Sequence, residues 1–276
     1  MNVKRLTRGV QPILAILACV LIIGIPLYLL VITSFKSDAE AQVPDLSLPT
    51  TWHIVENYGR AISDGDVLGG LFGSLLVTVP SVFGVLVLGS AASWVLARRS
   101  SKVMGLLYSV GISGIILPPA VVTMVLTLQS LGLDGSALGM IGVYMGMFMA
   151  TAIFFTTGFV RNIPVELEEA ARIDGASPFT VYLRVVLPLL RPVIATAAIL
   201  VTLSVWNEVF YAFFVLSGSG ASTLPLNLFN VASQSEYVKN WNLIFAYVVL
   251  MSIPMVVTFI IAQRRIVAGV TAGAVK

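Results

Sequence analysis

Glu208 is the one acidic residue that lies inside a long apolar stretch of this sequence, within the run Trp206-Asn207-Glu208. An acid at membrane depth is destabilising unless it is paired or hydrated, so its presence there indicates a specific role. Three roles are open. The carboxylate could brace a neighbouring helix, it could line a pathway and contact a polar solute with Trp206 and Asn207, or it could relay protons.

Residues for other chemistry are scarce. A single cysteine, Cys19, excludes an internal disulfide framework, and a single histidine, His53, leaves no cluster of Cys and His that could hold zinc. No stretch matches the pattern G-x-x-x-x-G-K-[ST] of a phosphate-binding loop. We therefore expect no catalytic residue, no metal site and no cofactor bound by this chain itself.

The composition predicts a membrane protein. Of the 276 residues, 58% are hydrophobic and 11% are charged, whereas soluble domains carry roughly 25% charged residues. The mean hydropathy of +0.97 agrees. A bilayer core of about 30 Å needs about 20 apolar helical residues. We predict an all-α membrane protein, a single domain over residues 1–276, with six spans at about 10–34, 69–97, 103–127, 138–160, 192–216 and 242–262.

Charge placement predicts the orientation, because Lys and Arg near span ends stay in the cytoplasm. All lysines and arginines except Lys36, Arg60 and Lys239 fall on one side of the predicted membrane, together with both termini. This bias accounts for the pI near 9.1 without nucleic-acid binding. The first apolar run is longer than the about 7–15 residues of a signal sequence, so we expect a retained anchor, with cleavage near Ala39 or Ala41 as the alternative.

Several features should shape the spans and the outer segments. The pair Pro118-Pro119 should break the third span. Small residues such as Gly84 and Gly89 should let helices approach closely. The outer segments 35–68 and 217–241 are long enough to meet a partner, although solvated loops with interfacial aromatic residues are the alternative.

Residues 161–191 form a cytoplasmic segment too long for a simple connector. Pro164 and three glutamates, at 166, 168 and 169, are typical of a helix N-terminus. Gly175 predicts a left-handed stop, and Ser177-Pro178 predicts the start of a second helix that runs to Leu187. This hairpin could lie on the lipid surface, but an anionic leaflet would repel the glutamates, so we favour docking to a protein.

The same segment is similar to a known motif. Glu169-Ala170-Ala171, then Gly175, then Val185-Val186-Leu187-Pro188 resemble the EAA loop of binding-protein-dependent ABC importer permeases. The resemblance extends along most of the chain and is strongest to the maltose-type (MalG-like) carbohydrate subfamily. Asn57-Tyr58, Arg161-x-Ile163-Pro164 and the C-terminal tail 263–276 also match. Gly73-Ser74 departs from the subfamily's usual Asn-Ser.

The resemblance implies a non-enzymatic permease of a bacterial cytoplasmic membrane that moves a sugar or oligosaccharide by alternating access. It implies a second, related permease, two cytoplasmic ATPase subunits that use ATP and Mg, and an extracytoplasmic solute-binding protein. The residues that it assigns to ATPase coupling are Glu168, Glu169, Ala170, Ala171, Asp174, Gly175, Leu187 and Pro188. Those assigned to tail contact with the ATPase are Gly269, Thr271, Gly273 and Lys276.

Three other functions stay open beside this one. The first is a permease of the same superfamily for a solute other than a sugar. The second is a proton-coupled secondary transporter with Glu208 as its relay, which leaves the EAA-like loop and the tail unexplained. The third is a membrane scaffold without transport activity. Under the importer hypothesis, Trp206, Asn207 and Glu208 either brace helices or contact a sugar hydroxyl.

Overall fold

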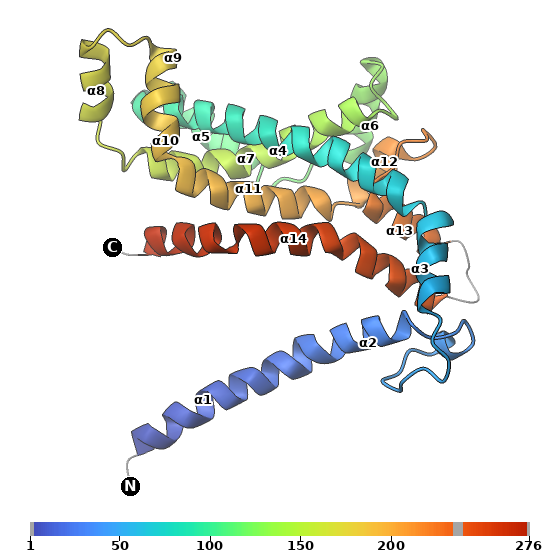
Figure 1. Cartoon of the computed structure of the whole chain (residues 1–276). Coiled ribbons are helices and arrows are strands. Elements are labelled where there is room, and N and C mark those ends of the chain that lie inside the picture. Colours follow the sequence, from blue (N-terminus) through green and yellow to red (C-terminus); the bar gives the residue numbers. More distant parts are fainter. Residues whose placement is uncertain (1–2, 234–239, 275–276) are drawn as a thin grey trace. The chain divides into compact units, whose positions relative to one another are not determined.

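The structure is a computed structural model that describes residues 3–233 and 240–274, with side chains described for 11–233 and 240–263. Every regular element within these ranges is a helix, as the composition predicts. The chain divides into two compact units, residues 1–68 with 227–253 and residues 69–226 with 254–276. Figure 1 shows the helices along the chain.

The first unit contains the N-terminal span and an outer segment. Its helices are α1 (Val3–Cys19), the π-helical η1 (Val20–Gly24), α2 (Ile25–Thr33), the short η2 (Glu40–Gln42), α3 (Ile54–Ser63), most of α13 (Leu224–Ser233) and the first part of α14 (Trp241–Ala274). Helices α1, η1 and α2 follow one another without a break and supply the apolar span Gln11–Thr33.

The second unit holds the remaining helices. They are α4 (Val67–Arg98, from Gly69 on), α5 (Lys102–Ser113), α6 (Val121–Ser130), α7 (Ala137–Val160), α8 (Glu166–Ile173), α9 (Pro178–Val181), the π-helical η3 (Tyr182–Val186), α10 (Leu187–Leu189), α11 (Arg191–Trp206) and α12 (Phe210–Leu216). Within this unit α8 and α9 lie at one end of the long helices, and α6 and α12 lie at the other (Figure 1).

The described helices do not all match the six predicted spans. Four are long and apolar enough to cross a membrane: Gln11–Thr33, Val67–Arg98, Ala137–Val160 and Trp241–Gln263. The pair Pro178–Leu189 and Arg191–Trp206, bent by 77°, would be a fifth. In place of the third predicted span the chain forms the shorter helices α5 and α6. The break contains Pro118-Pro119 and confirms the predicted interruption, while the count of six stays a prediction.

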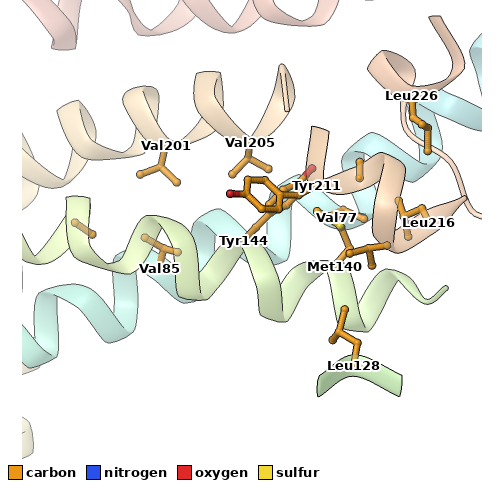
Figure 2. Packing of buried hydrophobic residues seen from close by; sticks show 13 residues of the cluster. Val77, Val85, Leu128, Met140, Tyr144, Val201, Val205, Tyr211, Leu216 and Leu226 are labelled. Atoms are coloured by element: carbon orange, nitrogen blue, oxygen red, sulfur yellow. The ribbon is translucent and has the colours of Figure 1, made fainter. Parts of the chain in front are cut away.

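The core of the second unit lies where α4, α7, α11 and α12 meet. Tyr144 and Met140 of α7 are fully buried there against Val77, Val205 and other apolar side chains (Figure 2). Close helix approach by small residues is confirmed at Gly84 and Gly89, where an added Cβ would lie 2.6 Å from Met145 Cε and 2.9 Å from the Cβ of Ala152. Both neighbours belong to α7.

Candidate coupling site

The segment 161–191 folds as the predicted helix, glycine turn and second helix. Helix α8 carries all three glutamates in its first turn, where the free N–H groups and the helix dipole favour negative charge. Gly175 adopts a φ of +82°, a left-handed backbone conformation that residues with a side chain rarely adopt. The Ser177 hydroxyl then accepts a hydrogen bond from the Thr180 amide at 3.2 Å. This bond caps α9, whose first residue is Pro178.

The sequence predicts that the second helix ends at Leu187, before Pro188. In the structure this helix continues to Leu189. The turn before this proline is π-helical, from Tyr182 to Val186, and α10 begins at Leu187. A wider π turn changes the hydrogen-bond register, so the missing N–H and the ring of a proline can be accommodated. Arg191 then begins α11 at the 77° bend.

One face of α8 is turned into the protein. Glu168 is 1% exposed. Its Oε1 accepts the Nε–H of Arg98 at 2.7 Å, and its Oε2 accepts the indole N–H of Trp94 at 2.9 Å. Arg172, one turn further along α8, lies 3.7 Å from the same carboxylate. Ala171 also faces inward and packs against the cluster of Val160, Val181, Val186 and Leu190.

The opposite face of α8 is exposed and combines acidic with apolar groups. Glu166, Glu169 and Ala170 are exposed, and so are Asp174 and Gly175 just beyond the helix. Two large apolar side chains outside the predicted set are also exposed, Ile173 of α8 at 86% and Phe179 of the following α9 at 70%. Helical spacing could have found Ile173, because residues 166, 169, 170 and 173 share one face.

Leu187 and Pro188 lie apart from the exposed face of α8. With Leu183, Arg191, Pro192, Ile194 and Ala195 they line a hollow of about 810 Å³ at the start of α11. Leu187 also packs against the buried cluster beneath the hairpin. The predicted coupling residues therefore fall into three groups. Four are exposed (Glu169, Ala170, Asp174 and Gly175), two face inward (Glu168 and Ala171), and two line the hollow (Leu187 and Pro188).

Glu208 lies in a break that divides the predicted fifth span into α11 and α12. Its carboxylate accepts the amides of Tyr211 at 2.7 Å and Ala212 at 3.1 Å, which satisfies free N–H groups at the start of α12. The Tyr144 hydroxyl donates to it at 2.9 Å. Trp206 is buried, and its indole N–H has no hydrogen-bond partner among the residues that the structure describes. Asn207 is exposed and bonds Leu203 of its own helix. These contacts correspond to the bracing role.

Comparison with known proteins decides the family. Residues 69–271 match the family described as "Binding-protein-dependent transport system inner membrane component". The chain belongs to this family. It is therefore the inner-membrane permease component of a binding-protein-dependent transport system. That α8 and its glycine turn form the EAA loop of this family stays a prediction.

Relatives of this permease cover nearly its whole length. It is 31% identical to the probable starch degradation products transport system permease protein AmyC of Thermoanaerobacterium thermosulfurigenes, over 91% of each chain. It is also 31% identical to the melibiose/raffinose/stachyose import permease protein MelC of Bacillus subtilis, over 98% of this chain and 96% of the relative. A chain of a crystallised bacterial alginate importer shares the fold, with a TM-score of 0.82, 20% identity and coverage of 96% of this chain and 98% of that one.

The predicted tail contacts of this permease lie largely outside the described part of the chain. The α14 backbone continues to Ala274, through Gly269, Thr271 and Gly273, but side chains from residue 264 onward lie outside the described residues, and Lys276 lies outside them entirely. The contact of this tail with an ATPase stays a prediction.

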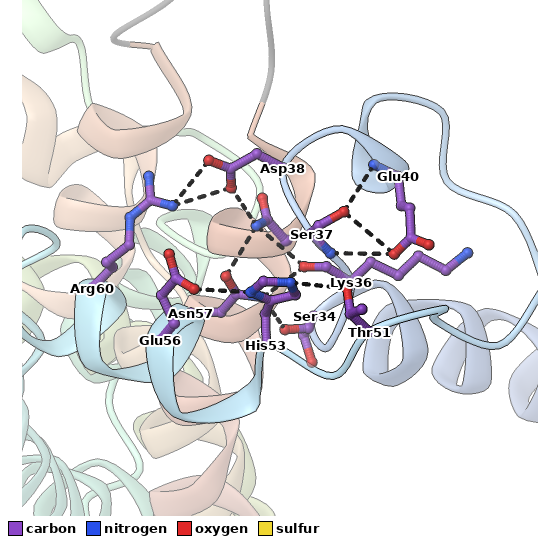
Figure 3. A network of polar contacts seen from close by, with 11 residues as sticks. Ser34, Lys36, Ser37, Asp38, Glu40, Thr51, His53, Glu56, Asn57 and Arg60 are labelled. Atoms are coloured by element: carbon purple, nitrogen blue, oxygen red, sulfur yellow. Dashed lines mark hydrogen bonds and ion pairs between the residues drawn. The ribbon is translucent and has the colours of Figure 1, made fainter.

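The segment 35–68 of the permease is held by a polar network in the first unit (Figure 3). Buried Asn57 donates its amide hydrogens to the carbonyls of Ser34 at 2.9 Å and Lys36 at 2.8 Å. Asn242, at the start of α14, donates to the Asn57 amide oxygen at 3.1 Å and to Asp38 at 2.6 Å. The hydrogen bond from Asn242, with Arg60 beside the carboxylate, lowers the pKa of Asp38.

Proposed function

We propose that this permease is the membrane-spanning subunit of an ATP-driven importer that moves a sugar or oligosaccharide into a bacterial cell by alternating access. The observation that carries the proposal is the exposed face of α8. Ile173 remains exposed on the same helical face as Glu166 and Glu169, and Phe179, in α9, is exposed as well. Exposed apolar side chains rimmed by polar ones are typical of a protein-binding surface.

A cytoplasmic ATPase fits this surface better than a lipid headgroup layer does. Glutamates on the exposed face would be repelled by an anionic leaflet, whereas a basic and apolar groove on a protein would accept them together with Ile173. The sequence has no phosphate-binding loop of its own. ATP and Mg are accordingly used by two ATPase subunits, and this chain transmits their movement without hydrolysing anything.

The remaining partners follow from the family and from the placement of charge. A second, related permease completes the pathway, and a solute-binding protein delivers the substrate to the outer segments 35–68 and 217–241. Both termini and α8 are cytoplasmic, because lysine and arginine are concentrated there. The carbohydrate substrate is supported by relatives that are named for starch products, for melibiose, raffinose and stachyose, and for trehalose.

Reconstitution into proteoliposomes tests the proposal. The permease is combined with its second permease, the ATPase and the binding protein, and uptake of labelled trehalose, raffinose and malto-oligosaccharides is measured, with an amino acid as the non-sugar control. We expect sugar uptake that requires ATP and survives a protonophore. Uptake of the amino acid alone would contradict the carbohydrate substrate, and flux driven by a pH gradient without ATP would indicate a secondary transporter. A complete absence of flux would favour a scaffold.

A further inference from the structure

Helix α4 presents one row of side chains to the hairpin of residues 161–191, called the coupling hairpin from here on. Ser90, Trp94 and Arg98 are spaced by four residues, so they lie on one face of this helix. The Ser90 hydroxyl and the Tyr182 hydroxyl form a hydrogen bond of 2.7 Å. The Trp94 ring stacks on the Tyr182 ring, with centroids 5.7 Å apart and planes 30° apart.

Arg98, the last residue of α4, holds the hairpin at two points. Its Nε–H donates to Glu168 at 2.7 Å, and a terminal N–H donates to the Ile163 carbonyl at 2.8 Å. Ile163 lies in the connection that leads into α8, and Glu168 lies in the first turn of α8. The entry and the beginning of the coupling helix are therefore bonded to the same end of the same spanning helix.

The Glu168 carboxylate is the centre of these contacts. Both of its oxygens are used within the chain, by Arg98 and by Trp94. A carboxylate removed from water is stable only while it is paired and hydrogen-bonded. Moving α8 away from α4 would break both of its hydrogen bonds and leave only Arg172, 3.7 Å away on α8 itself. The outer face of α8, with Glu169 and Ile173, is unaffected by these bonds and stays available to a partner.

We propose that Glu168 is a positioning residue that joins α8 to α4, so that movement of the docked coupling helix carries the inner end of α4 with it. This inference rests on the proposed function. Its role differs from that of Glu169, because Glu168 acts on this chain's own spanning helix and has no part in holding the ATPase. Removal of the Glu168 carboxylate should therefore leave the ATPase bound but weaken the link between hydrolysis and transport.

The test compares purified, reconstituted complexes by the amount of sugar moved for each ATP hydrolysed. We expect Glu168→Ala and Glu168→Gln to lower this ratio by roughly two- to thirty-fold, the range that a changed coupling energy produces. The ATPase should co-purify with both variants in normal amount. Trp94→Phe removes one donor to Glu168 but keeps an aromatic ring that can stack on Tyr182, and a smaller decrease is expected.

Ser113→Ala is the matched control, since within the described part of the structure this α5 hydroxyl donates only to the Val110 carbonyl of its own helix, and it should keep the normal ratio. If Glu168→Ala does not assemble, Glu168→Gln and Trp94→Phe decide. A simple folding defect lowers the yield of complex without changing the amount of sugar moved per ATP. An unchanged ratio would therefore overturn the proposal that Glu168 joins α8 to α4. Loss of the ATPase from Glu168→Gln also overturns it. Absence of ATP-driven flux in the unaltered complex would overturn the proposed function as well.

Discussion

The hydroxyl of Tyr144, in the first half of α7, donates a hydrogen bond to the carboxylate of Glu208 across 2.9 Å. The same carboxylate accepts the first free amides of α12, at Tyr211 and Ala212. The acid therefore ties the broken fifth span to α7 at the point where α11 ends. This arrangement explains how an ionisable residue is accommodated within an apolar region.

Replacement of Glu208 should reduce stability. In Glu208→Ala three buried donors lose their acceptor, so we expect the free energy of unfolding to fall by about 1–3 kcal/mol. Thermal unfolding in detergent measures the change. Asn207→Ala is the control, because that amide is exposed and bonds its own helix. If Glu208→Ala unfolds normally but loses uptake, Glu208 contacts the solute and the bracing role is wrong.

Changes on the exposed face of the coupling hairpin should prevent docking. Ile173→Asp and Glu169→Lys place unfavourable charge on that face, and Gly175→Asp puts a side chain at a φ of +82°. Sugar uptake by cells should fall to background in each variant, while the protein still reaches the membrane. Co-purification of the ATPase measures the docking itself.

The control for this set is Gly158→Ala. Gly158 lies in α7, and a Cβ added there would meet nothing within 4 Å in the described structure, so the added methyl group should leave uptake unchanged. If Ile173→Asp and Glu169→Lys both keep normal uptake and bind the ATPase, the docking surface lies elsewhere on the chain.

The outer segment should resist acid. The Lys36 ammonium, which is buried, and the Ser47 hydroxyl hold the pKa of Asp45 at about 2, below its usual 3.8. Because this pKa is lowered by folding, the ion pair stabilises the segment above about pH 4, and the stabilisation is lost as pH falls towards 2. Hydrogen bonds from Thr50 lower the pKa of Glu40 in the same direction.

Pepsin cleavage of the segment 35–68 between pH 4 and pH 2 checks this prediction. The unaltered protein should be protected at pH 4 and cleaved faster as the pH falls. Asp45→Asn should be cleaved at pH 4 nearly as fast as at pH 2. The control Asp64→Asn alters a carboxylate that accepts a hydrogen bond from neighbouring Ser63, and it should keep the normal profile. A steep acid transition retained by Asp45→Asn would contradict the role of the ion pair.

Gly73 stands where the subfamily usually has Asn, and in this structure the position should tolerate no side chain. A Cβ there would overlap the carbonyl oxygen of Ser222, and the adjacent Ser74 hydroxyl accepts the Leu224 amide at 2.8 Å. Backbone cannot move aside as a flexible side chain can, so Gly73→Ala should lower the free energy of unfolding by about 1–3 kcal/mol.

Alanine substitutions at two other glycines, Gly84 and Gly111, give a graded series of unfolding temperatures for comparison with Gly73→Ala. Gly84→Ala should cost less than Gly73→Ala, because the atom that it meets is the flexible end of Met145. Gly111→Ala meets nothing within 4 Å and should be neutral or slightly stabilising, since alanine favours a helix. Equal unfolding temperatures for all three variants would contradict the close approach of α4 to residue 222.

Local features of the sequence were sufficient to predict the helical hairpin of residues 161–191. Pro164, Gly175 and Ser177-Pro178 act on the backbone within a few residues, so their effect does not depend on the rest of the fold. The break at Pro118-Pro119 was predictable for the same reason. The membrane class and the family were also accessible, because hydropathy and the spacing of the EAA-like motif are properties of the linear chain.

Only the tertiary structure decided which residues of that hairpin are buried and which stay exposed. Glu168 and Glu169 are adjacent and chemically identical, yet one is buried and the other exposed, because α8 packs its inner face against Trp94 and Arg98, which lie 74 and 70 residues away in the sequence. Glu208 likewise obtains Tyr144 from a helix 64 residues earlier. Partners this distant leave no periodic or local trace in the chain, so the orientation of each carboxylate is determined only when the helices pack.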